Sequence, residues 1–134
     1  MNTKLAAARI VTRDVAALAR FHQRVTGVLP VGSEEYVELR MPGARLAICS
    51  ENAVRLFGVA AAESATNRSL ILDFEVEDVD VERARLDGVV VDWVLEPTTQ
   101  PWGNRSMLFR DPDGNLVNVF APLPFEARRC SRHR

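Results

Sequence analysis

Residues 102–116 read WGNRSMLFRDPDGNL, in which a tight turn separates two apolar stretches. Pro112 holds φ at about −65°, and Gly114 admits the left-handed backbone conformation that ends such a turn. Asp and Asn side chains beside a turn commonly hydrogen-bond to nearby backbone amides. The pattern therefore predicts a hairpin that joins a strand over 104–110 to a strand over 115–121.

The residues that precede this hairpin predict a helix between two further strands. Residues 69–76 and 89–95 are rich in Val, Leu and Ile, as strands commonly are. Between them, Asp78 is a typical helix N-cap, and Gly88 is typical of the position just after a helix. We expect residues 96–103 to form a loop.

The first half of the chain repeats this order of elements. Apolar side chains recur three to four positions apart between Asp14 and Gly27, which predicts a capped amphipathic helix. Predicted strands flank this helix, over 5–12 on one side and over 28–31, 35–41 and 45–49 on the other.

The two halves thus form an internal repeat. The paired landmarks, offset by about 60 to 70 residues, are Asp14 with Asp78, Gly27 with Gly88, and Gly43 with Gly114. We predict an α+β fold of two tandem β-α-β-β-β modules, over about 5–50 and about 69–121. We expect one strand of each module to pair across, so that a curved mixed sheet surrounds a cleft.

Composition is that of one globular domain with an uneven distribution of charge. The 134 residues are 47% hydrophobic and 26% charged, which suits a single domain over residues 1–127. Without the four arginines of residues 128–134, 13 basic residues face 18 acidic ones, a net charge of −5. This acidic body argues against nucleic-acid binding, and we expect the basic tail, 128–134, to be disordered.

The cysteines and the apolar segments indicate a cytoplasmic protein. Cys49 and Cys130 are too few and too far apart for a disulfide framework. The apolar patch at 5–8 is too short for a signal peptide, and no run approaches the length of a membrane span. We therefore expect no membrane partner.

The run 102–116, together with Thr12-Arg13-Asp14 before the first helix and Gly27 after it, resembles the glyoxalase / bleomycin-resistance / extradiol-dioxygenase superfamily. Members of this superfamily are also called vicinal oxygen chelate proteins. The resemblance covers about residues 5–121. It implies either a metalloenzyme or a metal-free protein that sequesters drugs. A homodimer is expected, because each half-sheet leaves apolar edges and members of the superfamily commonly pair.

The resemblance also implies four metal-ligand positions, which His, Glu or Gln occupy in the enzymes. In this sequence they fall on Ala7, Ala47, Ile71 and Asn118. Three of these side chains have no donor atom, and an Asn amide oxygen is a weak neutral ligand. We therefore expect no metal at this place and no cofactor.

The remaining donors have no partner at metal-ligand spacing. His133 lies in the tail, and His22 is expected at the surface of the first helix or partly buried within it. Cys49 is in phase with Ala47, and a lone thiol of this kind is usually a small buried side chain. A metal site displaced from the usual positions stays an alternative.

Strand alternation predicts which side chains line the cleft. The sets assigned to it are Ala7, Arg9 and Val11; Arg45, Ala47 and Cys49; Ile71, Asp73 and Glu75; Leu116, Asn118 and Phe120; and Arg105, Met107 and Phe109. Apolar walls with a few polar anchors are typical of a small-molecule pocket. The predicted ligand-binding residues are Arg9, Ala47, Phe57, Ile71, Asp73, Trp102, Arg105 and Asn118.

Several of these residues have two interpretations. Trp102 either stacks on a planar ligand, with Arg9 or Arg105 meeting an anionic group, or closes the end of the sheet. Phe57 either forms the opposite wall or packs within the joining segment. Asp73 and Glu75 are either acid–base groups or salt-bridge partners of an arginine.

Three functions follow from these observations. The first is a metal-independent protein that binds an aromatic or cationic small molecule, in the manner of the drug-sequestering members, since the acidic body suits a cation. The second is a glyoxalase- or dioxygenase-like lyase or isomerase that uses Asp73, Glu75 or a displaced metal. The third is a module that binds a protein partner.

Overall fold

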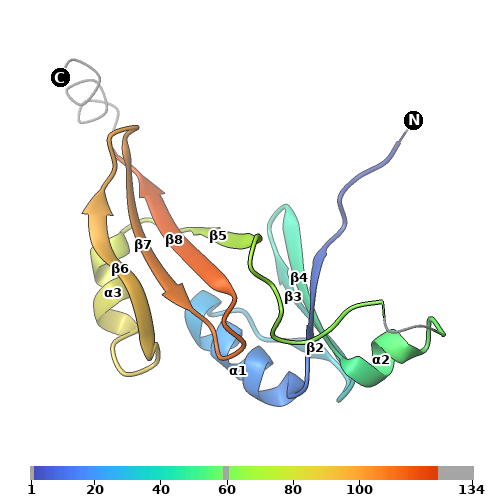
Figure 1. Cartoon of the computed structure of the whole chain (residues 1–134). Coiled ribbons are helices and arrows are strands. Elements are labelled where there is room, and N and C mark those ends of the chain that lie inside the picture. Colours follow the sequence, from blue (N-terminus) through green and yellow to red (C-terminus); the bar gives the residue numbers. More distant parts are fainter. Residues whose placement is uncertain (1, 59–60, 124–134) are drawn as a thin grey trace. The chain divides into compact units, whose positions relative to one another are not determined.

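The computed structural model describes residues 2–58 and 61–123, so the predicted tail lies outside the described residues. Two compact units divide the chain: one holds the residues up to 67 together with 112–114, and the other holds 68–111 and the residues from 115 onward. We call the first of these units module one and the second module two. Their strands and helices are labelled in Figure 1.

Module one is a four-stranded mixed sheet with one long helix. Its elements are β1 (Ala8–Thr12), α1 (Val15–Thr26), β2 (Val31–Gly32), β3 (Tyr36–Met41), β4 (Ala44–Ser50) and α2 (Glu51–Arg55). The strand order is β1-β4-β3-β2, in which β1 runs parallel to β4 and the other neighbours are antiparallel.

Module two repeats this plan, as the internal repeat predicts. Its elements are β5 (Ile71–Glu75), α3 (Val79–Arg85), β6 (Asp92–Thr99), β7 (Asn104–Arg110) and β8 (Leu116–Pro122). The order is β5-β8-β7-β6, with β5 parallel to β8. The predicted α+β fold of two β-α-β-β-β modules is confirmed.

The two module helices begin where their predicted caps lie. The Asp14 carboxylate accepts a hydrogen bond from the backbone N–H of Ala17 at 3.0 Å, and Asp78 does the same for Val81 at 3.1 Å. Helix α1 ends at Gly27, whose φ of 75° is left-handed. Helix α3 ends earlier than predicted, at Arg85, before the turn that leads to Gly88.

One face of the sheet in module one packs against α1. Strand alternation places Leu39, Leu46 and Ile48 together on this face, all buried, and α1 contacts both of their strands. Helix α1 buries His22 completely, where a surface or partly buried position was predicted, because the residue falls on the apolar side between Leu18 and Val25.

The turn quoted first is structural, as its sequence indicates. Asp111 and Asn115 are both buried; the Asn115 backbone N–H and side-chain amide donate to the Asp111 carboxylate at 2.9 and 2.8 Å. Gly114 has a φ of 83°, the left-handed conformation that the turn requires.

Two expectations about the elements are wrong, and one helix was not predicted. The joining segment holds the short helix α2, which Ser50 caps. Its five residues are too few to show a helical periodicity in the sequence. Strand β6 runs on into the predicted loop, to Thr99, with register shifts on either side of Leu95; an edge strand tolerates Pro97, which has no N–H to donate. Each sheet is completed within its own module, since β1 and β5 pair with β4 and β8.

No helix among the described residues is long and apolar enough to cross a membrane.

Candidate functional site

The side chains of greatest chemical interest lie on the sheet face turned away from the helix of each module, which we call the open face. In module one, β4 lies between β1 and β3 and contributes Ala47 and Cys49 to this face. Both are fully buried, and Cys49 carries a free thiol, as its sequence environment predicted. Larger side chains of the two flanking strands stand on either side.

Arg9 and Tyr36 come from these two flanking strands. Arg9 pairs with Ala47 across one boundary of β4, and Tyr36 pairs with Cys49 across the other. The Arg9 guanidinium carbon lies 5.5 Å from the centroid of the Tyr36 ring, so the Arg9 side chain passes across β4 to stack on the tyrosine. The open face thus holds a guanidinium on an aromatic ring above two small side chains.

Glu38 joins this pair from β3. The Tyr36 hydroxyl donates to one Glu38 oxygen at 3.1 Å, and Arg40 Nε donates to the other at 3.1 Å. Arg45 Nη1 lies 3.8 Å from the same carboxylate. The hydrogen bond from Arg40, followed by that from Tyr36, holds the pKa of Glu38 below its usual range.

The electrostatics keep Tyr36 protonated and the face positive. Desolvation, reinforced by the hydrogen bond to Glu38, raises the pKa of Tyr36 above its usual 10.0. Arg40 and Arg45 lie beside the Glu38 carboxylate and Arg9 lies over Tyr36, so these three guanidinium groups and one carboxylate leave two net positive charges. Within module one, Arg9 has no carboxylate partner among the described residues.

The sequence analysis placed Arg9, Arg45 and Ala47 on this face but missed the contribution of β3. Tyr36, Glu38 and Arg40 stand at alternate positions, separated by Val37 and Leu39, which are both buried. This alternation was available in the sequence. Their contact with Arg9 was not, because it depends on the parallel pairing of β1 with β4, which are about 35 residues apart.

The open face of module two carries the predicted carboxylates. Asp73 and Asn118 are register partners on β5 and β8, and the Asn118 amide donates to the Asp73 carboxylate at 2.9 Å. Ile71, Asp73 and Glu75 are exposed, while Leu72 and Phe74 turn toward the helix and are less so. The predicted face of these residues is confirmed; their part in binding a ligand stays a prediction.

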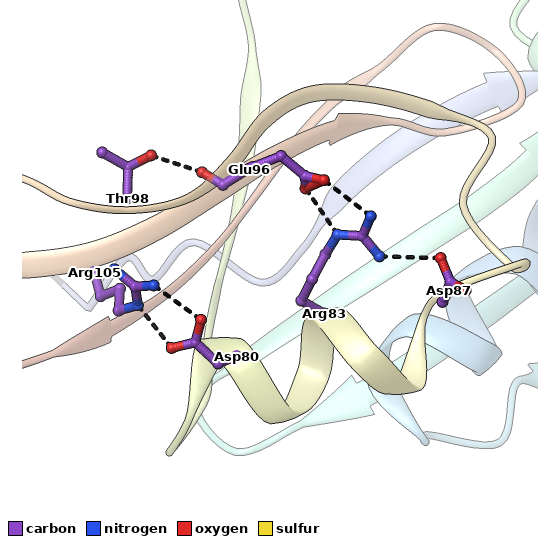
Figure 2. Close-up of polar contacts among 6 residues, drawn as sticks. All are labelled: Asp80, Arg83, Asp87, Glu96, Thr98 and Arg105. Atoms are coloured by element: carbon purple, nitrogen blue, oxygen red, sulfur yellow. Dashed lines mark hydrogen bonds and ion pairs between the residues drawn. The ribbon is translucent and has the colours of Figure 1, made fainter.

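Arg105 lies on the opposite face from the predicted one (Figure 2). It donates in a bidentate manner to Asp80 of α3, at 2.7 and 2.9 Å. It also donates to the Thr99 hydroxyl at 3.1 Å. Leu108 is the register partner of Asn118, so Leu108 lies on the open face. Arg105 stands three positions before Leu108 and therefore lies on the other face, toward α3, with fully buried Met107 and Phe109. Arg105 is therefore no salt-bridge partner for Asp73 or Glu75.

A second arginine holds the other end of α3 to the sheet (Figure 2). Arg83 binds both oxygens of Glu96 on β6, at 2.8 and 2.9 Å, and Asp87 at 3.2 Å. Its guanidinium carbon lies 3.9 Å from the centroid of the Trp93 ring, and that ring meets Phe109 edge to face. On the helix face of module two, Arg83 and Arg105 thus hold α3 to the sheet, and the part of Arg105 in binding a ligand stays a prediction.

The two aromatic candidates are both exposed. Trp102, which is 70% exposed, occupies the turn between β6 and β7, where the Gly103 N–H donates to the Gln100 carbonyl. Phe57, which is 66% exposed, follows α2 in module one. Their contribution to a binding site stays a prediction.

The four metal-ligand positions that the family resemblance implies do not fit a metal. Ala7 precedes β1, Ala47 lies in β4, and Ile71 opens β5, and none of these side chains offers a donor. The fourth position, Asn118, gives its amide to Asp73. In the described ranges 2–58 and 61–123, no cluster of three His, Cys, Asp or Glu side chains is arranged to hold a metal ion.

Solved structures with the same fold support this description. A glyoxalase / bleomycin resistance protein / dioxygenase from Nocardioides is 24% identical, with a TM-score of 0.75 over 93% of this chain and 87% of that chain. A family enzyme from Burkholderia phytofirmans is 20% identical, with a TM-score of 0.81 over 90% and 100%. A fosfomycin resistance protein from Mesorhizobium loti is 19% identical, with a TM-score of 0.67 over 94% and 98%.

At these identities the likeness shows the fold alone, and comparison with the curated proteins found no match. The family comparison reaches further. The model of the Glyoxalase/Bleomycin resistance protein/Dioxygenase superfamily matches residues 4–119, which is most of the chain and includes both modules. The chain therefore belongs to the Glyoxalase/Bleomycin resistance protein/Dioxygenase superfamily.

Proposed function

We propose that this chain is a metal-independent protein that binds a small organic molecule on the open face of a module sheet. One observation carries the proposal: the four positions at which the family resemblance implies metal ligands are filled by two alanines, an isoleucine and an asparagine. A divalent cation needs several converging donors, and the three aliphatic side chains supply none. Binding therefore depends on hydrogen bonds, ion pairs and apolar contacts.

Module two supports a preference for a cationic or aromatic ligand. Asp73 and Glu75 are exposed on its open face, and Asn118 holds one oxygen of Asp73 in place. Ile71 and Phe120 add apolar surface on the same face. A planar cation suits this combination, which is the pattern expected of a sequestering protein.

The experiment has two parts. Elemental analysis of the purified protein is expected to find no stoichiometric transition metal, and treatment with a chelator is expected to leave ligand binding unchanged. Calorimetric titration with benzamidine and with a panel of planar cationic antibiotics is expected to give saturable heat. Stoichiometric Zn, Ni, Mn or Fe would contradict the proposal, as would an absence of heat across the whole panel.

Variants then locate the binding. Asp73→Asn and Glu75→Gln are each expected to weaken benzamidine binding by about tenfold, because each removes one negative charge from a polar contact. Glu34→Gln removes an exposed carboxylate from the loop before β3 and serves as the control. Equal affinities for all three variants would contradict the assignment to module two.

A lyase or isomerase is the second candidate, favoured by the contact between Asp73 and Asn118. A side-chain amide that fixes a carboxylate oxygen is a common way to orient a general base. Turnover of a carbonyl substrate that is lost in Asp73→Asn and kept in Glu34→Gln would support this candidate over simple binding.

Homodimerisation is part of the proposal. Val31 of edge strand β2 is 50% exposed, and Leu29, two positions before that strand, is 69% exposed. Val94 of edge strand β6 is 46% exposed. Exposed apolar side chains beside unpaired strand edges commonly mark a protein–protein contact. Light scattering is expected to give twice the chain mass of 14.9 kDa.

A further inference from the structure

We infer that the open face of module one binds the oxyanion group of a small organic molecule, through Arg9 and the neighbouring Arg45 and Arg40. A carboxylate, a phosphate and a phosphonate share the required chemistry. The inference rests on the proposed function, since it assigns a binding group of the ligand to residues on one of the open faces. It adds a group of arginines that recognises an anion, which the acidic composition of the chain does not suggest.

The register brings the three arginines to one area of the face. Arg9 is the partner of Ala47 on β4, and Arg45 stands two residues before Ala47 on the same side of that strand. Arg40 is the register partner of Arg45 on β3. Diagonal and direct neighbours on one sheet face are within reach of long side chains. The three arginines thus project from positions around Ala47, with the Arg9 guanidinium over Tyr36 and those of Arg40 and Arg45 beside Glu38.

Arg9 is the group best prepared to bind an anion. Its guanidinium carbon lies 5.5 Å from the centroid of the Tyr36 ring. A guanidinium carries five N–H donors in a planar fork that fits carboxylate and phosphate oxygens. With no carboxylate partner for Arg9 in the described part of module one, these donors match the two oxygens of a carboxylate or phosphonate.

The carboxylate in this cluster does not compete for Arg9. One Glu38 oxygen accepts from Tyr36 and the other from Arg40, each at 3.1 Å, so both are engaged. Tyr36 remains neutral at physiological pH and therefore does not repel an anion. The two net positive charges on this face contrast with a body of net charge −5, which focuses an anionic group on this face.

The test compares matched aromatic probes by calorimetry on the full chain at low ionic strength. Benzoate and phenylphosphonate distinguish a carboxylate from a phosphonate, and benzamidine is a cation of similar shape. We expect saturable binding of at least one anion that weakens with added salt. Arg9→Gln is expected to lower that affinity about tenfold or more, and Arg45→Gln by less.

Two further variants act as controls. Arg20→Gln removes an exposed arginine of α1, on the other side of the sheet, and is expected to leave anion binding unchanged. Arg9→Lys keeps the charge without the planar pair of donors, so it is expected to lie between wild type and Arg9→Gln. Circular dichroism melts identify any variant that fails to fold, in which case Arg9→Lys decides the comparison.

The outcomes separate this inference from the proposed function. Anion binding that is equal in wild type and Arg9→Gln would overturn the inference, and so would an absence of anion binding while benzamidine still binds. The latter result would leave the proposed function intact. Loss of saturable binding for every probe, or a stoichiometric metal, would count against the proposed function itself.

Discussion

Modules one and two share one order of elements but differ in what they place on each face of the sheet. Module one gives its open face an arginine-rich cluster around Glu38 and Tyr36, and module two gives the same face Asp73 and Glu75. The repeat therefore specifies a backbone plan, whereas strand residues at alternate positions specify the chemistry. The equivalent faces of the two modules therefore carry opposite charge.

The helix faces differ as well. Helix α1 has 12 residues and buries five of them, including Leu18 and His22, against its sheet. Helix α3 has seven residues and buries only Val79. A short helix offers little apolar area, and here ion pairs of Arg83 and Arg105 supplement it. Burial holds α1, while α3 depends on a mixture of burial and charge.

The largest expected effect is the loss of unfolding free energy when a core side chain of either module is truncated. Phe109 is fully buried in module two and packs edge to face on Trp93, and Leu18 is 1% exposed in module one. Phe109→Ala is expected to cost about 3–5 kcal/mol and Leu18→Ala about 2–5 kcal/mol of unfolding free energy. Urea denaturation measures both. Val91→Ala, at a site that is 92% exposed, is the control; a comparable loss there would contradict the burial argument.

Loss of a helix cap is expected to lower the unfolding free energy by less, and to affect the helices of the two modules differently. Asp14→Ala and Asp78→Ala each remove one side-chain acceptor and are expected to cost about 1 kcal/mol. Because α3 has less burial to hold it, hydrogen exchange is expected to accelerate more in α3 of Asp78→Ala than in α1 of Asp14→Ala. Equal acceleration would show that the two helices depend on their caps to the same degree.

Acid is expected to weaken module two through its ion pairs. Arg105 and Arg83 hold the pKa of Asp80 and of Glu96 below their ordinary values of 3.8 and 4.5. The stabilisation is therefore present above those values and is lost as the pH falls below them. Melting temperature is expected to fall across this range, and less steeply in Arg83→Met. An unchanged slope in that variant would assign the acid sensitivity to other carboxylates, such as Glu38.

Local signals predicted most of the fold, and the errors arose where the answer depends on distant residues. Asp14, Asp78 and Gly27 mark helix ends because caps act within one turn. The face of Arg105 was wrong because alternation within one strand gives two sets of side chains without saying which set meets the helix. The pairing of Leu108 with Asn118 decides it. The cluster of Arg9 with Tyr36 and Glu38 likewise required the pairing of three strands.

The smallest expected effect is a shift in the titration of Tyr36, which can be followed by itself because it is the only tyrosine of the chain. Desolvation and Glu38 raise its pKa above 10.0, whereas the Arg9 charge lowers it. The phenolate absorbance is therefore expected to appear above pH 10 in wild type, at lower pH in Glu38→Gln and at higher pH in Arg9→Gln. Because the neutral phenol is favoured in the folded state, its contribution to stability is present below pH 10 and is lost as the pH rises through the raised pKa. Arg20→Gln is the control. Shifts in the reverse directions would mean that Arg9 and Glu38 do not contact the ring in solution, and the charge difference between the two open faces would then need another explanation.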